Sequence, residues 1–370
     1  MNFDLTEEQQ LLANTTRDLL ARSYDTESRN RIIEAPLATS VGWNPQVWRQ
    51  LAEVGVLGLG FDEDSGPIEV MIVLIEAGRH LAPEPIAAAA LIPGTVLAAH
   101  GSPDQRALLE GVASGELLLA FAHTEPGRRG ANTLATRATE HNGSWTVTGR
   151  KGPVLAGASA DHLVVSAALP GGEPGLFLVD ATATARVGYR SFDGQRCADI
   201  EFIDTPAQPL GNGGDASAAI AQTVIRFQSA LCAEAVGAMT ESVQLTTEYL
   251  KSRKQFGVPL KSFQTLTQRA ADMYVALELA RSMNFYAAVC LADGRFDPIA
   301  AGRAKLEIGR CGRHIAQESI QLHGGIGVTA EYPIAHYAAR LTAIEATFGS
   351  STDHLRYLSR QIGDYGVVSI

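Results

Sequence analysis

Arg253-Lys254-Gln255-Phe256-Gly257 and Gln321-Leu322-His323-Gly324-Gly325-Ile326-Gly327 are the two most informative stretches of this chain, and each follows a long helical pattern. The first places an always-charged guanidinium, an amide and an aromatic ring on one turn, which can hold a pyrophosphate and a flat ring system. The second supplies backbone amides at a helix end, where glycines permit close approach to a phosphate-bearing ligand. Together they predict helix ends that bind a cofactor containing phosphate groups and a ring.

The composition is typical of a globular protein with more than one domain. With 370 residues, of which 46% are apolar, the chain is long enough for two or three packed units. The net charge of −10 argues against nucleic acid as a partner, because phosphate backbones are bound by clustered Lys and Arg. The sequence opens with acidic residues and shows no apolar signal segment, and its uninterrupted apolar stretches are far shorter than the roughly 20 residues that span a bilayer. We therefore expect a cytoplasmic protein that binds neither nucleic acid nor membrane.

The four cysteines are widely spaced and form no Cys-x-x-Cys motif. No His cluster with metal-site spacing lies near them. We therefore expect buried thiols and no metal site for Cys197, Cys232, Cys290 and Cys311.

The first half of the chain changes from helical to β patterns. Residues 1–116 are predicted to form an N-terminal helical domain, with helices near 4–22, 45–54, 68–82, 84–99 and 104–113. Residues 117–208 are predicted to form a small β domain, because short β-rich runs alternate with Gly, Asn, Asp and Pro turns. These runs are 117–121, 144–148, 162–167, 175–179 and 198–202.

The second half returns to helical patterns after a Pro- and Gly-rich linker at 206–214. Residues 215–370 are predicted to form a C-terminal bundle of four-helix type, with helices near 216–252, 262–293, 298–322, 333–346 and 351–362. The predicted fold class is therefore α+β.

The order of elements and the two opening stretches resemble the flavin-dependent acyl-CoA dehydrogenases over essentially the full chain. The resemblance implies FAD as the cofactor. In that family the two C-terminal motifs hold the FAD of a neighbouring subunit, and a Gln at the offset of Gln264 also reaches FAD. It implies cofactor-binding roles across an interface for Arg253, Gln255, Phe256, Gln264, Gln321, Leu322, His323, Gly324 and Gly325. The side chain of His323 is itself expected to pack or to contact solvent.

The motifs that contact a chain's own flavin ring are only partly present. Residues 121–127 resemble the family's Thr-Glu-Pro-Gly loop, so Thr124 is expected at the edge of the isoalloxazine. Residues 128–131, Arg-Arg-Gly-Ala, depart from the family pattern of small residues and Ser-Asp. The family's Trp-Ile-Thr/Ser motif is also lost, because Pro153 cannot stack as Trp does and Leu155 has no hydroxyl. We therefore expect the chain's own flavin pocket to be degraded.

The catalytic base of the family is missing from both of its usual positions. Ala346-Thr347-Phe348-Gly349-Ser350-Ser351 falls where the family carries an aromatic-Glu-Gly-Thr motif, and Gly349 stands in the place of the Glu. Some members place the Glu on the preceding long helix, at the position of Phe227 here. A positioned carboxylate accelerates removal of the substrate α-proton by roughly 10²–10⁴-fold. No catalytic residue is therefore predicted, with Glu345 as a weak substitute candidate and Glu234 as a structural acid.

The resemblance implies a subunit of a heteromeric acyl-CoA dehydrogenase, an oxidoreductase that desaturates a CoA thioester. The family includes bacterial α2β2 enzymes of steroid side-chain degradation in which one chain carries the Glu and a paralogous chain completes the FAD sites. The implied partners are such a paralogous subunit, an acyl-CoA substrate and an electron-transferring flavoprotein. Two alternatives stay open: an active homotetramer that uses Glu345 or another acid, and a scaffold without FAD.

Overall fold

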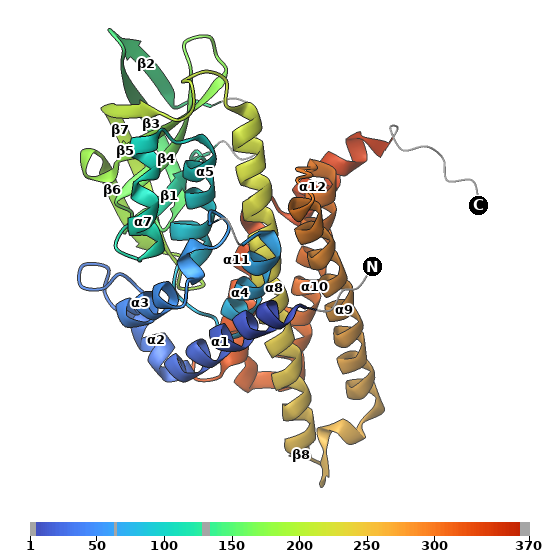
Figure 1. Ribbon diagram of the computed structural model, residues 1–370. Coiled ribbons are helices and arrows are strands. Elements are labelled where there is room, and N and C mark those ends of the chain that lie inside the picture. The colour runs from blue at the N-terminus through green and yellow to red at the C-terminus, as the bar shows by residue number, and fades with distance from the viewer. Residues whose placement is uncertain (1–4, 63–64, 128–133, 363–370) are drawn as a thin grey trace. The chain divides into compact units, whose positions relative to one another are not determined.

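The computed structural model describes residues 5–62, 65–127 and 134–362, and their elements follow the predicted order of helices, strands and helices (Figure 1). The α+β fold class is confirmed. The chain divides into two compact units: one comprises residues up to 27, residues 71–82 and residues from 228 onward, and the other comprises 28–70 and 83–227. The division into three domains at 1–116, 117–208 and 215–370 stays a prediction.

The N-terminal third is helical, as the sequence predicts. Its helices are α1 (Glu7–Ser23), α2 (Thr26–Glu34), α3 (Pro45–Glu53), α4 (Pro67–Arg79), the π-helix η2 (Ile86–Leu91), α5 (Ile92–His100), α6 (Pro103–Arg106) and α7 (Leu108–Ala113). Thr6 begins α1 with a capping box, because its side chain accepts from the amide of Gln9 and the Gln9 side chain accepts from the amide of Thr6. Helix α2 was not predicted, because its polar residues give no clear apolar period.

A seven-stranded sheet forms the middle of the chain. Its strands are β1 (Leu119–Ala122), β2 (Arg137–His141), β3 (Ser144–Leu155), β4 (His162–Ala168), β5 (Pro174–Asp180), β6 (Ala185–Arg190) and β7 (Arg196–Pro209). The pairings β2–β3, β3–β7, β7–β5, β5–β4 and β4–β2 close a ring, which removes most free edges. A buried apolar cluster that includes Phe177, Ile200 and Phe202 packs this domain.

The linker prediction for 206–214 is partly wrong, because β7 continues to Pro209. Pro206 and Ala207 pair with Thr146 and Trp145 of β3. A proline in a strand donates no amide hydrogen bond, but its carbonyl can still accept one from the neighbouring strand. The prolines of this segment therefore do not exclude a strand. The connection to the next helix is therefore shorter than predicted.

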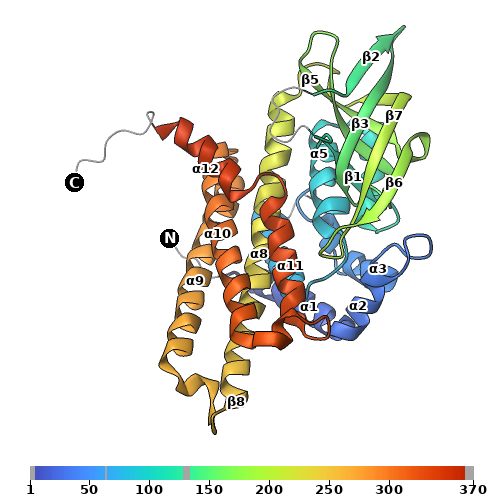
Figure 2. The same cartoon turned by 180° about the vertical axis from the view of Figure 1, so that it is seen from behind.

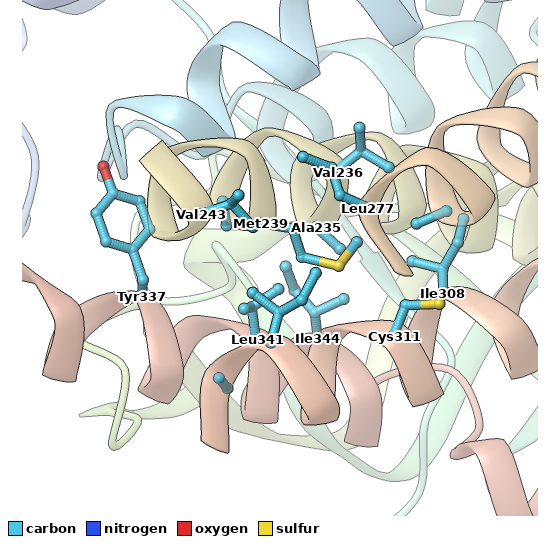
Figure 3. Close-up of a cluster of buried hydrophobic side chains, with 14 of the residues drawn as sticks. Ala235, Val236, Met239, Val243, Leu277, Ile308, Cys311, Tyr337, Leu341 and Ile344 are labelled. Carbon is cyan, nitrogen blue, oxygen red and sulfur yellow. The ribbon is translucent and has the colours of Figure 1, made fainter. Parts of the chain in front are cut away.

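The C-terminal helices lie side by side in both views (Figure 2). They are α8 (Ser217–Ser252), α9 (Gln264–Ala292), α10 (Pro298–His323), α11 (Pro333–Ala346) and α12 (Ser351–Arg360). Figure 3 shows Met239, Ile308, Cys311, Leu341 and Ile344 converging from α8, α10 and α11 in one buried cluster. This packing fixes the ends of α8 and α10, which carry the two opening motifs.

Helix α9 is apolar around most of its circumference. By length and composition alone it is the one helix among the described residues that is long and apolar enough to cross a membrane, and 39% of its most apolar window is buried. The core helix of a bundle passes the same test. Here Met273, Leu277 and Ala287 of α9 lie in the bundle core, while Val275 and Leu279 are 66% and 45% exposed. One face of α9 is therefore packed and another is uncovered in the single chain.

Candidate functional site

The first motif forms an exposed turn at the end of α8. Arg253 follows the helix, and its carbonyl accepts a hydrogen bond of 2.8 Å from the amide of Leu260 across the short hairpin of β8 (Lys254–Gln255) and β9 (Val258–Pro259). Phe256 stands at the tip with φ of 51° and is 92% exposed. The turn thus presents a guanidinium, an amide and a ring to its surroundings.

The second motif forms the end of α10. Gly324 caps the helix with φ of 66°, and its amide donates to the carbonyls of Gln321 and Ile320. Leu322 is buried, whereas Gln321, Gly324 and Gly325 are exposed. The backbone around the glycines is therefore accessible to a ligand.

Three aromatic rings bring the two helix ends together. Tyr249 lies one turn before Arg253, and its ring centroid is 4.4 Å from that of His323, which is 5.0 Å from that of Tyr332. His323 is 4% exposed, its Nδ1 lies 2.7 Å from the carbonyl oxygen of Ser319, and burial lowers its pKa. The imidazole therefore belongs to the packing, and only the backbone of His323 is available to a ligand.

The two tyrosines of this cluster were missed from the sequence. Tyr249 lies four residues before Arg253, which places it over the same side of the helix end, and this spacing was the available signal. Tyr332 stands in the Glu-Tyr-Pro segment that follows the glycines.

The residues of the two helix ends fit a phosphate-bearing ring cofactor. The exposed side chains of Arg253 and Gln264 form no hydrogen bond with any described part of the chain. A guanidinium with unused N–H groups binds phosphate oxygens, and an exposed ring offers a stacking face. Both features are consistent with FAD held by these helix ends.

The β domain contains a buried charged network that the sequence analysis did not identify. Lys151 Nζ lies 2.8 Å from Glu125 Oε1, and the two side chains are 0% and 5% exposed. Lys151 also donates to the carbonyl of His123 at 3.1 Å and to Ser166 Oγ at 3.3 Å. Burial lowers the pKa of Lys151 to about 8, against the stabilising effect of Glu125.

Glu125 is held ionised by its partners. Burial alone raises its pKa, but the hydrogen bonds from Lys151 and from the backbone amides of Ala135 and Thr136 lower it to about 2. The network therefore ties the loop at His123, Thr124 and Glu125 to strand β3.

We expect His123 to give the chain an acid-sensitive stability. Burial, and then Lys151, lower the pKa of His123 from 6.5 to about 4, with Glu125 opposing. Between pH 6.5 and about 4, His123 therefore binds a proton in the unfolded chain but not in the folded chain. The free energy of unfolding falls as the pH falls through this range. From pH 7.5 to 5 this group is expected to lower the free energy of unfolding by about 2 kcal/mol. The contributions of Glu125 and Lys151 between these pH values are small and opposite in sign, because the two groups titrate mainly outside the window.

Urea unfolding of the wild type and of His123→Gln at the two pH values measures this effect. The variant should lose less stability on acidification than the wild type. His141→Gln, which changes an exposed imidazole, should leave the pH dependence unchanged. An equal loss in the wild type and in His123→Gln would contradict the assignment.

The residues expected to contact the chain's own flavin ring do not form a recognisable flavin-binding site. The Thr124 carbonyl accepts a hydrogen bond of 2.8 Å from the Gly152 amide, while Pro153 is exposed and Leu155 is half-buried. The departure at Arg128 to Ala131 lies outside the described residues. Thr124 as a flavin contact stays a prediction.

Phe227, at one of the two base positions, is part of a stack of rings. It is 3% exposed, and its ring lies 5.8 Å from that of Phe121 at an interplanar angle of 17°. Phe121 in turn stacks on His123 at 5.4 Å and 11°. An aromatic ring therefore occupies the position and cannot accept a proton.

At the other base position, the backbone itself disfavours a side chain. Gly349 has φ of 100°, and a Cβ built on it would lie 2.7 Å from His354 Nε2. His354 is 9% exposed, and its Nε2 has no hydrogen-bond partner in the described part of the chain. Burial is the main cause that lowers the pKa of this imidazole. The place of the missing side chain is thus filled by the ring of His354.

Two further side chains fix this turn. Lys305, 1% exposed, donates to the carbonyls of Ile344 at 2.6 Å, of Glu345 at 3.3 Å and of Gly349 at 3.2 Å. Gln228 Nε2 donates to the carbonyl of Phe348 at 3.0 Å. The peptide groups on both sides of the base position are therefore held in place.

Glu345 has a structural environment. Arg313 lies 2.8 Å from its Oε1, and the amide of Ser351 donates to the same oxygen at 2.9 Å. A carboxylate at the start of α12 is stabilised by the helix dipole. Glu234, the other acid considered, forms a two-point ion pair with Arg340 at 2.6 and 2.7 Å.

Comparison with known families decides the assignment. Residues 6–116 match the model of the acyl-CoA dehydrogenase N-terminal domain, and residues 219–363 match that of the C-terminal domain. The chain belongs to the acyl-CoA dehydrogenase family. Its membership confirms the fold class and FAD as the cofactor of the family.

Known acyl-CoA dehydrogenases are similar over nearly the full length. Acyl-CoA dehydrogenase IpdE2 of Mycobacterium tuberculosis is 29% identical over 96% of this chain and 98% of its own length. A variant of the Tcur3481–Tcur3483 steroid ACAD is 30% identical, with a TM-score of 0.89 over 97% of this chain and 98% of that one. A glutaryl-CoA dehydrogenase of Mycobacterium smegmatis in complex with FADH2 shares the fold, at 20% identity and a TM-score of 0.86 over 99% of this chain and 97% of that one.

FAD supplies the chemistry of this family, because its ring accepts a hydride from the substrate. In this acyl-CoA dehydrogenase chain, Arg253 and the end of α10 are suited to hold the phosphates, and Phe256 and Gln264 are suited to contact the remainder of the cofactor. At the two positions predicted for the base, Phe227 has a ring that cannot accept a proton and Gly349 has no side chain. Groups suited to a phosphate-bearing ring cofactor are thus exposed at the two helix ends, whereas neither position predicted for the base carries a carboxylate.

Proposed function

We propose that this chain is the non-catalytic subunit of a heteromeric, FAD-dependent acyl-CoA dehydrogenase. In this role it completes the FAD site of a paralogous subunit that supplies the catalytic Glu. The proposed assembly is an α2β2 heterotetramer with two flavins, inactive when this chain is alone.

The observation that carries the proposal is the contrast between the two sets of residues. One set is exposed and therefore accessible to a cofactor bound by another subunit; it consists of Arg253, Gln255, Phe256 and Gln264. At the base position, by contrast, Gly349 has a backbone that only glycine adopts easily. A protein that binds a cofactor without the group for proton abstraction serves a partner that has this group.

The uncovered face of α9 supports the presence of a partner subunit. Tyr274, Val275, Leu279 and Tyr286 recur at helical spacing and are 55%, 66%, 45% and 39% exposed. Exposed apolar residues gathered along one helix mark interaction surfaces. A second subunit packed on this face removes them from water.

We infer the substrate class by analogy with the similar steroid ACAD, so a CoA thioester of a steroid side chain is proposed. An electron-transferring flavoprotein is proposed as the electron acceptor, and the cytoplasm as the location. Turnover of the mixed complex on steroid side-chain CoA esters and on straight-chain acyl-CoAs tests the substrate. A clear preference for short straight chains would contradict the steroid assignment.

The alternative of an active homotetramer is less well supported. Its candidate base, Glu345, is engaged by Arg313 and by the amide of Ser351. The alternative of a scaffold without FAD leaves the exposed set around Arg253 without a role.

Purification of this chain alone and together with the product of a neighbouring paralogous gene separates these functions. We expect little flavin and negligible activity for the chain alone, and a yellow, active complex after mixing, with two flavins per tetramer. Stoichiometric flavin and normal turnover from the isolated chain would support the homotetramer instead. A colourless mixture would support the scaffold.

Arg253→Ala is expected to lower the FAD affinity of the mixed complex by about 1.5–3 kcal/mol, because one charged hydrogen-bonding group is removed. This corresponds to a loss of roughly 10- to 150-fold in affinity. Flavin titration of the purified complex measures it. Arg310→Ala, which removes an exposed arginine on α10 away from the motif, is the matched control. Unchanged flavin affinity in the Arg253→Ala complex would refute the role of Arg253.

A further inference from the structure

The lysines of this chain are concentrated at one end of the helical bundle. Two of its five lysines, Lys151 and Lys305, are 0% and 1% exposed and donate hydrogen bonds inside the protein. The other three are exposed and lie within residues 251–261, at the end of α8 and in the hairpin that follows. They are Lys251, Lys254 and Lys261. All lysines that solvent can reach are therefore found on one short segment.

The hairpin brings this segment together in space. Lys254 of β8 pairs with Pro259 of β9, and Lys261 follows in the short helix η4 (Leu260–Ser262). Figures 1 and 2 both show the hairpin projecting from the bundle beyond the ends of α10 and α11. We call the four exposed cations of this segment the basic tip: Lys251, Arg253, Lys254 and Lys261.

No acid of the described chain compensates the basic tip. The sequence has no Asp or Glu between Glu248 and Asp272, and the carboxylate of Glu248 accepts a hydrogen bond of 3.2 Å from Gln244. Within the described residues, the four cationic side chains of the tip form neither an ion pair nor a hydrogen bond. Like charges held close together repel one another, so the cluster is unfavourable for the isolated chain. An anionic partner lowers this cost.

The cofactor alone does not match the charge of the tip. In the proposed function Arg253 holds the pyrophosphate of FAD, for which a planar guanidinium is well suited. A pyrophosphate diester carries one negative charge on each phosphate, fewer in total than the positive charges of the tip. A lysine ammonium is a strongly hydrated point charge on a flexible stem, which suits contacts with carboxylates at a solvated rim. The three lysines are therefore available to acidic groups beside the cofactor.

We propose that the basic tip docks on an acidic surface of the paralogous subunit, next to the FAD that Arg253 contacts, and that its lysines accelerate the encounter of the two chains. This inference rests on the proposed function, since it concerns the partner of that assembly. Opposite charges at the rim of an interface act mainly on the association rate. A nucleic acid or an anionic membrane fits less well, because an extended polyanion repels the rest of a chain whose net charge is −10.

Stopped-flow association of this chain with the paralogous subunit measures the effect of the lysines. At an ionic strength of about 0.01 M, where charges act over roughly 30 Å, the triple variant Lys251→Gln, Lys254→Gln, Lys261→Gln should associate at least about tenfold more slowly than the wild type. At about 1 M, where screening limits charges to roughly 3 Å, the two rates should converge. The flavin affinity of the assembled complex should change by less than about twofold, in contrast to the loss expected for Arg253→Ala.

A variant with the same change in net charge is the matched control. Arg49→Gln, Arg106→Gln and Arg310→Gln together remove three exposed arginines outside the tip. This variant should associate within about twofold of the wild-type rate, since the effect is local to the tip. Equal slowing in both triple variants, or wild-type association in the lysine variant, would overturn the inference while leaving the proposed function intact. If the wild type forms no complex, the proposed function fails and the inference fails with it.

Carbodiimide cross-linking of the mixed complex identifies the surface that the tip meets, because the reagent joins an amine to a carboxylate in direct contact through an amide bond. Peptides that join Lys251, Lys254 or Lys261 to an Asp or Glu of the paralogous subunit support the inference. Links confined to this chain or to a second copy of it would overturn the choice of partner. So would salt-dependent binding to phosphatidylglycerol vesicles that the mixed complex retains, because the tip would then be free in the complex.

Discussion

Replacing Glu125 by glutamine is expected to lower the free energy of unfolding by about 3–5 kcal/mol, because the Lys151 ammonium is left buried without an opposite charge. The side chains of the pair are 5% and 0% exposed, and solvent cannot take the place of the carboxylate. Glu125 also accepts the amides of Ala135 and Thr136 at 2.7 and 2.9 Å, so the loop that follows Thr124 loses charged acceptors as well. Urea unfolding followed by tryptophan fluorescence at pH 7.5 measures the loss.

Two comparisons show whether the buried charge is the cause. Glu125→Gln combined with Lys151→Met should be more stable than Glu125→Gln alone, since the double variant no longer buries an uncompensated ammonium. Glu201→Gln removes an acid from the neighbouring Arg150 ion pair, whose side chains are 40% and 71% exposed, and should change stability by less than about 1 kcal/mol. Similar losses in Glu125→Gln and Glu201→Gln would refute the role of burial.

The sequence predicted the elements whose signals are local. The long helices from α8 onward carry apolar residues at helical spacing over many turns, and their predicted bounds differ from the observed ones by a few residues. Helix α2 and strands β2 and β6 were missed, because their mostly polar and exposed residues show no clear apolar period. Pro206 indicated a linker, although pairing with Thr146 keeps it in a strand.

In the candidate site, too, residues within one contiguous motif could be predicted from the sequence, whereas contacts between distant residues could not. Arg253, Gln255 and the glycines after His323 form contiguous motifs, so their position on exposed helix ends followed from the sequence. Lys151 and Glu125 are 26 residues apart, and Lys305 lies 44 residues before Gly349; such contacts depend on packing that no local pattern reveals. That Gly349 takes the place of the Glu stays a prediction from the sequence, whereas the contact of this position with the ring of His354 could not be predicted from it.

The geometry around Gly349 changes what a rescue experiment is expected to show. If only the carboxylate were absent, Gly349→Glu would restore some activity. The backbone there has φ of 100°, which L-residues disfavour by about 1–2 kcal/mol, and the new Cβ would lie 2.7 Å from His354 Nε2. Lys305 and Gln228 hold the carbonyls of Gly349 and Phe348, so the turn cannot rotate away without breaking those hydrogen bonds. We therefore expect Gly349→Glu to lose at least about 2 kcal/mol of stability and to gain no dehydrogenase activity.

Gly349→Ala separates the backbone from the carboxylate, because it adds the Cβ alone. It should lose nearly as much stability as Gly349→Glu, and combining either change with His354→Ala should recover the part due to the contact with the ring while leaving the part due to φ. Acyl-CoA-dependent bleaching of the flavin in the variant chain alone, supplied with FAD, is the matching activity measurement. If Gly349→Glu were as stable as the wild type and reduced its flavin without the paralogous subunit, the turn would be mobile and the missing carboxylate would be the sole defect. The exclusion of a side chain by His354 and by the fixed backbone supports the proposal that this chain does not supply the catalytic base.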